Sequence, residues 1–357
     1  MQLALRVEQV REEHIEAYCQ LSRAEYGDAV AVAQARHLRW KFIENPQGPS
    51  IGIHLYKGDE LVGRMVALTR QFLYQGMVYK AAHIVDFVVH PKERGMSSLL
   101  MLVSGLKQLS GYDFLLIMAP NAAGAAVWEK FVKMRGYFEL DVAVAPLRPF
   151  ALLEATGKLR VGPIEPILDW PWRILVGATT RLLSYLGDVQ IELEWPSSAE
   201  IDKMLSSNEN DRVIGVRSAA YLEWRYRRSP VFQYRVLFLR RKGALEGYFV
   251  TRRTLHDGID GLFVVDAFGR QGLTDGTWRA TGRKEISRAS ADGAAMTMLM
   301  GNSAWGPLRA MNALPFLTVP PRFLPRKMTV YAEWKTSPGF EIGRNNFHLA
   351  LGDSDVI

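Results

Sequence analysis

The stretch Ile84-Val-Asp-Phe-Val-Val-His-Pro-Lys-Glu-Arg-Gly-Met-Ser-Ser-Leu-Leu-Met101 decides the fold of this chain. An apolar strand runs to Pro91, a basic turn with Gly95 follows, and an apolar helix begins directly after it. This order directs backbone N–H groups and the positive end of a helix dipole toward the space beside Lys92 and Arg94. Such a turn binds a phosphate or pyrophosphate, although a surface turn that only carries positive charge has the same pattern.

The flanks of this stretch form a regular series of elements. Residues 51–68 alternate in polarity around a turn signal at 57–59, which predicts a hairpin, and a strand at 77–89 leads into the basic turn. Downstream, the pattern predicts a helix at 99–109 and a buried strand at 112–118, which ends before Asn121. A second helix is predicted at 122–134 and is followed by Gly136-Tyr137.

This order resembles the core of the GNAT acetyltransferases, over about residues 50–145. The family turn has Gln or Arg, two residues, Gly, one residue, and Gly or Ala. The run Lys92-Glu-Arg-Gly-Met-Ser97 departs from it at Lys92 and Ser97. The resemblance implies acetyl-CoA or another acyl-CoA as co-substrate, with the donor bound by Phe87, Val88, Val89, Lys92, Arg94, Gly95, Met96, Ser97, Ser98 and Asn121.

Composition excludes several other classes of protein. The chain has 357 residues, 48% of them hydrophobic, with no leader-like start and no apolar run of membrane-spanning length, so we expect a cytoplasmic protein. One cysteine, Cys19, excludes an intramolecular disulfide and a Cys-rich metal site, and we expect no metal. The net charge of +7 favours anionic small molecules, while the basic clusters are too short to predict a nucleic-acid partner. A homodimer is left open.

The two halves of the chain repeat each other. Leu38-Arg-Trp-Lys-Phe42 recurs as Leu222-Glu-Trp-Arg-Tyr226, each with a proline four residues on. Two further pairs follow in the same order, Asp86 with Asp266 in apolar strands and Asn121 with Asn302 ahead of helix-like segments. Trp40 and Trp224 are expected to anchor their helices to the sheets, and stacking on a sugar ring is the alternative.

The repeat predicts an α/β (α+β) fold of two tandem GNAT-like domains, each a mixed, mostly antiparallel sheet flanked by helices. We expect an acyl-CoA-binding domain at 1–150, a Pro-punctuated helical linker at 151–196, and a degenerate domain at 197–357 that shapes the acceptor site. The second copy lacks the basic turn after Asp266. The linker helix, expected at 172–186, is predicted to pack against the domains; a lid, an oligomer contact and a membrane-surface helix are the alternatives.

The chemistry requires a base, because an amine is protonated at neutral pH and must lose a proton before it attacks a thioester. The resemblance puts a carboxylate on the strand before the turn, where Asp86 stands. Its apolar context is expected to raise its pKa, and a structural carboxylate is the alternative. At the position of the tyrosine that is the family's common proton donor stands Trp128, which cannot act as an acid. Near the C-terminus, Asp353 and Asp355 either line the acceptor site or cap a turn.

The leading prediction is an acyl-CoA-dependent N-acyltransferase, most simply an acetyltransferase, that acts by direct attack on the thioester. The resemblance to tandem GNAT-like chains of bacterial polysaccharide synthesis implies an amino-sugar acceptor, free or nucleotide-linked. Two alternatives remain: a FemAB-like aminoacyltransferase and a non-catalytic CoA-binding or assembly protein.

Overall fold

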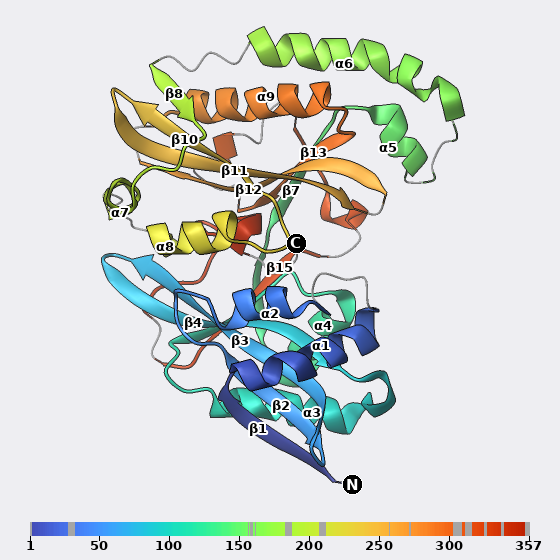
Figure 1. Ribbon diagram of the computed structural model, residues 1–357, viewed down its shortest axis with the longest axis vertical. Coiled ribbons are helices and arrows are strands. Elements are labelled where there is room, and N and C mark those ends of the chain that lie inside the picture. Colours follow the sequence, from blue (N-terminus) through green and yellow to red (C-terminus); the bar gives the residue numbers. More distant parts are fainter. Residues whose placement is uncertain are drawn as a thin grey trace. The chain divides into compact units, whose positions relative to one another are not determined.

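The chain is described by a computed structural model (Figure 1), which covers residues 2–27, 33–155, 157, 160, 162–182, 188–206, 212–256, 258–270, 273–302, 309–310, 316–324, 327–336 and 339–353. It divides into two compact units. The first contains Met1–Glu139, Asn210–Phe232 and Arg326–Asn346, and the second contains Leu140–Glu209, Gln233–Pro325 and Phe347–Ile357.

The first unit is built on a mixed sheet in the order β1-β2-β3-β4-β5-β15-β6, with β9 beside β3. Among the strand pairs whose register is described in this sheet, β4–β5 is parallel and the others are antiparallel. The strands are β1 (Leu3–Gln9), β2 (Ile51–Lys57), β3 (Glu60–Tyr74), β4 (Met77–Val89), β5 (Phe114–Met118), β6 (Arg135–Glu139), β9 (Val213–Gly215) and β15 (Thr329–Trp334). The hairpin at 51–68 and the strand at 77–89 are therefore confirmed.

Helices of the first unit cover both faces of its sheet. The predicted helices after the basic turn and after Asn121 are present. The first continues into a 3-10 helix, η3, and the second continues into a π-helix, η4. The helices are α1 (Glu12–Tyr26), α2 (Ala35–Phe42), η2 (Pro91–Glu93), α3 (Met96–Ser104), η3 (Gly105–Gln108), α4 (Ala122–Val127), η4 (Trp128–Val132), α8 (Ala219–Leu222) and η6 (Glu223–Arg227).

The second unit repeats this sheet, in the order β14-β7-β13-β12-β11-β10-β8. Within the part of this unit that the structure describes, β12–β13 is the parallel pair, and it corresponds to β4–β5. The strands are β7 (Asp141–Pro146), β8 (Val189–Glu192), β10 (Arg235–Arg241), β11 (Ala244–His256), β12 (Ile259–Gly269), β13 (Met296–Gly301) and β14 (Leu317–Thr318), with β16 (Phe347–His348) outside this order. Its helices are α5 (Pro149–Ala155), η5 (Gly162–Ile164), α6 (Glu165–Leu182), α7 (Ser198–Ser206), α9 (Asp275–Ala291), η7 (Pro321–Phe323) and η8 (Leu351–Asp353).

Each sequence half gives strands to the sheet built mainly from the other half: the first half gives β7, and the second half gives β9 and β15. β7 follows β6 directly in sequence but lies between β13 and β14, whereas β15 lies between β5 and β6. The units therefore differ from the expected ranges 1–150, 151–196 and 197–357. The expected linker belongs to the second unit, and its helix begins at Glu165 rather than at Trp172.

The same irregularity interrupts the corresponding strands of the two sheets. In β4, Asp86 and Phe87 face the single residue Met65, and in β12, Val265 is the extra residue beside Asp266. Asp86 has a φ of 49°, a left-handed conformation that aspartate tolerates better than most residues. The repeated aspartates of the sequence therefore mark β-bulges in corresponding strands, with Asp86 inside its bulge and Asp266 next to its own.

Candidate functional site

The basic turn leaves the start of α3 open. Gly95 is the N-cap residue, no side chain within residues 33–155 caps the first turn, and the first helical bond runs from Leu99 N to Gly95 O at 3.1 Å. The φ of Gly95 is 175°, which any residue adopts, and a Cβ added there would meet no heavy atom within 4 Å. The backbone therefore does not require glycine here, and the space beside the first-turn amides is accessible to an anion.

The charged side chains of this turn are partly engaged. Arg94 pairs with Glu25, and Lys57 Nζ lies 2.7 Å from Glu93 Oε1. Lys92, Met96 and Ser97 are exposed. Ser98 is buried and donates its hydroxyl to Glu93 O at 2.7 Å, so its side chain supports the turn from within.

Beside the turn, the parallel strands β4 and β5 separate. Their pairing ends at His83 with Leu116, so the later part of β4 has no β5 partner. The side chains of Phe87 and Val89 pack on one core cluster, while Val88 lies in the other. Phe87, Val88 and Val89 can therefore offer a donor molecule mainly their backbone along this edge.

Asn121 and Trp128 occupy structural positions on the next helix. Asn121 Oδ1 accepts the backbone N–H of Gly124 at 2.8 Å and so caps α4. Trp128 is buried, with its ring 6.3 Å from that of Phe87. A tyrosine that the sequence did not indicate, Tyr331 on β15, lies in the same core cluster; it donates to Glu129 at 2.6 Å, and burial raises its pKa to about 12.

Asp86 lies between two buried cations that the sequence analysis missed. Lys41 Nζ is 2.7 Å from Asp86 Oδ1, and Arg64 Nη2 is 3.0 Å from Oδ2. Arg64 also donates to Tyr18 O at 2.7 Å and to Ser22 Oγ at 2.8 Å. Arg64, a charged residue in the otherwise apolar first part of β3, was the one available signal.

The expectation that burial raises the pKa of Asp86 is wrong. Desolvation does act in that direction, but Lys41 and Arg64 outweigh it and hold the pKa of Asp86 well below its ordinary range. An ionised carboxylate held in this way accepts a proton poorly, and the contacts fit the structural alternative.

Asp353, near the C-terminus, lies in the second unit. Asp353 is buried in η8, and its Oδ2 accepts the backbone N–H of Ala350 at 2.9 Å, as expected for a carboxylate that caps a turn. Asp355 lies outside the described residues. The acceptor-binding role of both residues stays a prediction.

The repeated tryptophans contact each other. Trp40 and Trp224 are buried and stacked, with ring centroids 4.9 Å apart and an angle of 21° between the planes. Each indole N–H donates to the other residue's carbonyl oxygen at 2.8 Å. The pair joins the two copies of the motif symmetrically, and because both residues are buried as well as stacked, neither ring is accessible to a sugar.

The start of α9 differs from that of α3. Thr274 Oγ1 accepts the N–H of Thr277 at 3.2 Å, and Asp275 adds a negative charge to the first turn. The long helix α9 follows the β-bulge of β12, although the sequence after Asp266 lacks the basic turn and no helix was predicted there. Since its first turn is capped and acidic, it is a poor anion site, and the two halves differ as the sequence predicted.

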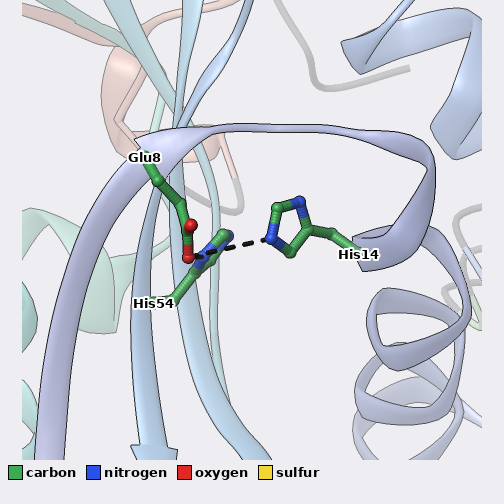
Figure 2. Close-up of side chains that lie close together, drawn as sticks. All are labelled: Glu8, His14 and His54. Atoms are coloured by element: carbon green, nitrogen blue, oxygen red, sulfur yellow. Dashed lines mark hydrogen bonds and ion pairs between the residues drawn. The ribbon is translucent and has the colours of Figure 1, made fainter.

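Glu8, His14 and His54 converge from β1, α1 and β2 (Figure 2). Their ligand atoms lie within 4.8 Å of one another, a set that zinc could use. However, His14 Nδ1 accepts the N–H of Arg11 at 3.0 Å, so this nitrogen is already engaged, while Nε2 faces Glu8. Both ring nitrogens of His54 are hydrogen-bonded, Nδ1 to Glu8 Oε1 at 3.2 Å and Nε2 to Tyr18 Oη at 2.6 Å. The contacts describe a hydrogen-bonded network, and the expected absence of metal stays a prediction.

Residues 6–110 match the family of the acetyltransferase (GNAT) domain. No curated protein matches the chain. Among the helices of the described residues, none is long and apolar enough to cross a membrane.

Three solved structures resemble this chain over nearly its whole length. A probable N-acyltransferase of unknown function from Enterococcus faecalis is 13% identical over 93% of this chain and 72% of its own, with a TM-score of 0.58. A GCN5-related N-acetyltransferase from Anabaena variabilis is 9% identical over 92% and 72%, with a TM-score of 0.59. The Saccharomyces cerevisiae N-myristoyltransferase with bound myristoyl-CoA is 11% identical over 92% and 78%, with a TM-score of 0.56. At these identities the likeness concerns the fold.

Proposed function

We propose that this chain is a GNAT-type N-acyltransferase that transfers an acyl group, most simply acetyl, from acyl-CoA to the amine of a small acceptor, and the match of residues 6–110 to the acetyltransferase (GNAT) domain supports this. The observation that carries this proposal is the uncapped start of α3 beside the open space at Gly95. Since the equivalent helix α9 is capped by Thr274, one half of the chain is suited to bind an anion and the other is not.

The first-turn amides of Met96, Ser97 and Ser98, together with Lys92, would hold the pyrophosphate of the donor. The unpaired edge of β4 beyond His83 is suited to accept hydrogen bonds from, or donate them to, an extended part of the same molecule. The residues present therefore fit a CoA-type donor, which supplies the activated acyl group when bound.

The role of Asp86 in this reaction is to position the strand. Its ion pairs with Lys41 and Arg64 fix the bulge of β4 in its left-handed conformation, directly before the residues that border the donor. An amine that attacks the thioester must lose a proton to another base or to water. Asp353 and Asp355 stay the carboxylates that are predicted to line the acceptor site. The prediction that the second half of the chain binds the acceptor rests on these two residues.

An amino sugar, free or nucleotide-linked, is the proposed acceptor. The net charge of +7 favours an anionic nucleotide-linked form over a neutral one. Trp40 and Trp224 are not part of this recognition, because they stack on each other.

Turnover tests the proposal. Thiol release from acetyl-CoA would be followed with a thiol-reactive dye in the presence of glucosamine, a nucleotide-linked amino sugar and simple alkylamines. We expect release that requires an amine, with the acylated product detected by mass spectrometry. Release without an amine, or none with any acyl-CoA, would contradict acyl transfer.

The second candidate is a non-catalytic CoA-binding protein. Trp128 in place of a proton donor and the low proton affinity of Asp86 favour it. Tight binding of acetyl-CoA without turnover over the whole amine panel is the result that would select this alternative.

A further inference from the structure

Helix α6 of the second unit turns its polar side inward. Glu165, Asp169, Val176 and Thr180, spaced by about one or two helical turns, are buried. Every exposed residue from 162 to 178 is apolar or glycine. A surface helix normally has the opposite arrangement, with its apolar stripe on the core.

The polar side of α6 is held by specific bonds. Arg148 Nη2 pairs with Glu165 Oε2 at 2.6 Å, and Asp169 accepts the N–H groups of Phe150 at 2.9 Å and Ala151 at 3.1 Å. Because these bonds anchor α6 to the residues before and within α5, the helix is fixed with its apolar side outward. The helix also packs against α9 (Figure 1).

The outward side carries large apolar residues. Ile167 is 72% exposed, Trp170 62%, Leu175 52% and Ile174 50%. Ile164, Leu168 and Trp172 continue the surface, and Leu153 of α5 is also exposed. At 1.5 Å per residue, the 18 residues of α6 present this surface over about 27 Å. An ordinary monomer exposes single, scattered apolar side chains, whereas here they follow one another along one helix.

We propose that this surface, the outward side of α6, docks in the plane of an anionic lipid bilayer. A helix with one apolar side fixed outward is the geometry of an in-plane membrane anchor, and tryptophan is enriched at the level of the lipid headgroups. The inference does not depend on acyl transfer.

The charges around α6 complement anionic lipid. The sequence from 158 to 181 contains four basic residues, Lys158, Arg160, Arg173 and Arg181, and two acidic residues, Glu165 and Asp169. Both acids are buried, so among the described residues the exposed charge of this segment is positive. A second copy of the chain is a poorer occupant, because an isologous contact would bring two equally basic segments together.

Co-sedimentation with vesicles tests the proposal. Wild-type protein should sediment with vesicles of phosphatidylcholine and phosphatidylglycerol, and less with phosphatidylcholine alone. The double variant Ile167→Glu/Trp170→Glu should bind at least about tenfold more weakly, since it removes two of the most exposed apolar side chains. Both sites are exposed, so thermal unfolding should be unchanged.

Leu255→Glu is the matched control, because Leu255 is 71% exposed on β11 of the same unit, away from α6 in sequence. It should bind vesicles like the wild type. Equal binding by the wild type and the double variant, or no binding by the wild type, would overturn the proposal. Light scattering that shows a dimer lost in the double variant, without vesicle binding, would overturn it in favour of a second copy.

Discussion

Replacing Asp86 by asparagine tests whether the buried charge cluster stabilises the first unit. Asparagine tolerates the φ of 49° and keeps the size of the side chain, so the change isolates the charge. The Asp86 side chain is 11% exposed, Lys41 4% and Arg64 1%, and the substitution removes the carboxylate charge that both nearly buried cations contact. Loss of one partner from a buried ion pair costs about 3–5 kcal/mol, and we expect Asp86→Asn to fall in that range.

Urea unfolding of the wild type and Asp86→Asn, followed by circular dichroism from pH 7 to pH 3, measures this effect. Because the folded pKa of Asp86 is depressed, its stabilisation is complete above its unfolded pKa of about 4 and decreases as the pH falls below that value. The difference between the two proteins should therefore be constant from pH 7 to about 5 and shrink below pH 4. Glu12→Gln, which breaks the exposed pair with Arg39, should leave the midpoint unchanged. A cost below about 1 kcal/mol with no dependence on pH would refute the reasoning.

Two further predictions concern the first unit. Trp40→Phe and Trp224→Phe each keep an aromatic ring but leave a buried carbonyl without its indole donor, so each should lower the free energy of unfolding by about 1–3 kcal/mol; a cost near zero in urea unfolding would show that these bonds contribute nothing. Burial lowers the pKa of His54 to about 4, so the stability that depends on its neutral form is complete above about pH 6.5 and decreases toward pH 4. Unfolding midpoints should fall over that range in the wild type and fall less in His54→Gln; identical pH profiles would contradict this.

Local patterns predicted the elements around the basic turn. The period-two alternation and the turn signal at 57–59 determine the first hairpin, and the apolar run before Pro91 determines β4. The repeat was also visible, because each of its two tryptophans follows a leucine by two residues and precedes a basic residue, an aromatic residue and a more distant proline. Their direct pairing was not, since it joins residues 184 positions apart in sequence.

Long-range placement explains what could not be predicted. No local pattern shows whether a strand joins the sheet of its own sequence half or the sheet of the other half. The exchange of β7 and β15 was therefore not predicted, and the expected domain ranges differ from the two units. The pKa of Asp86 was predicted in the wrong direction because its partners come from α2 and β3. The sequence predicted the helix of the linker, but at 172–186, and the buried contacts of Glu165 and Asp169 with residues around α5 could not be read from its spacing.

The most direct test of the donor site is a calorimetric titration of acetyl-CoA into the wild type and the variant Gly95→Asp. An aspartate at this N-cap position is compatible with the fold, since the added side chain has open space and is a favoured cap. Its carboxylate would occupy the first-turn amides and repel the pyrophosphate.

Gly276→Asp places the same charge in the first turn of α9, where a Cβ would meet Thr274 only at an ordinary 3.5 Å, and serves as the control. We predict that the wild type and Gly276→Asp bind acetyl-CoA equally and that Gly95→Asp binds about a hundredfold more weakly, with its thermal stability preserved. Unchanged binding by Gly95→Asp, or no binding by the wild type, would contradict the assignment of the α3 turn as the acyl-CoA site.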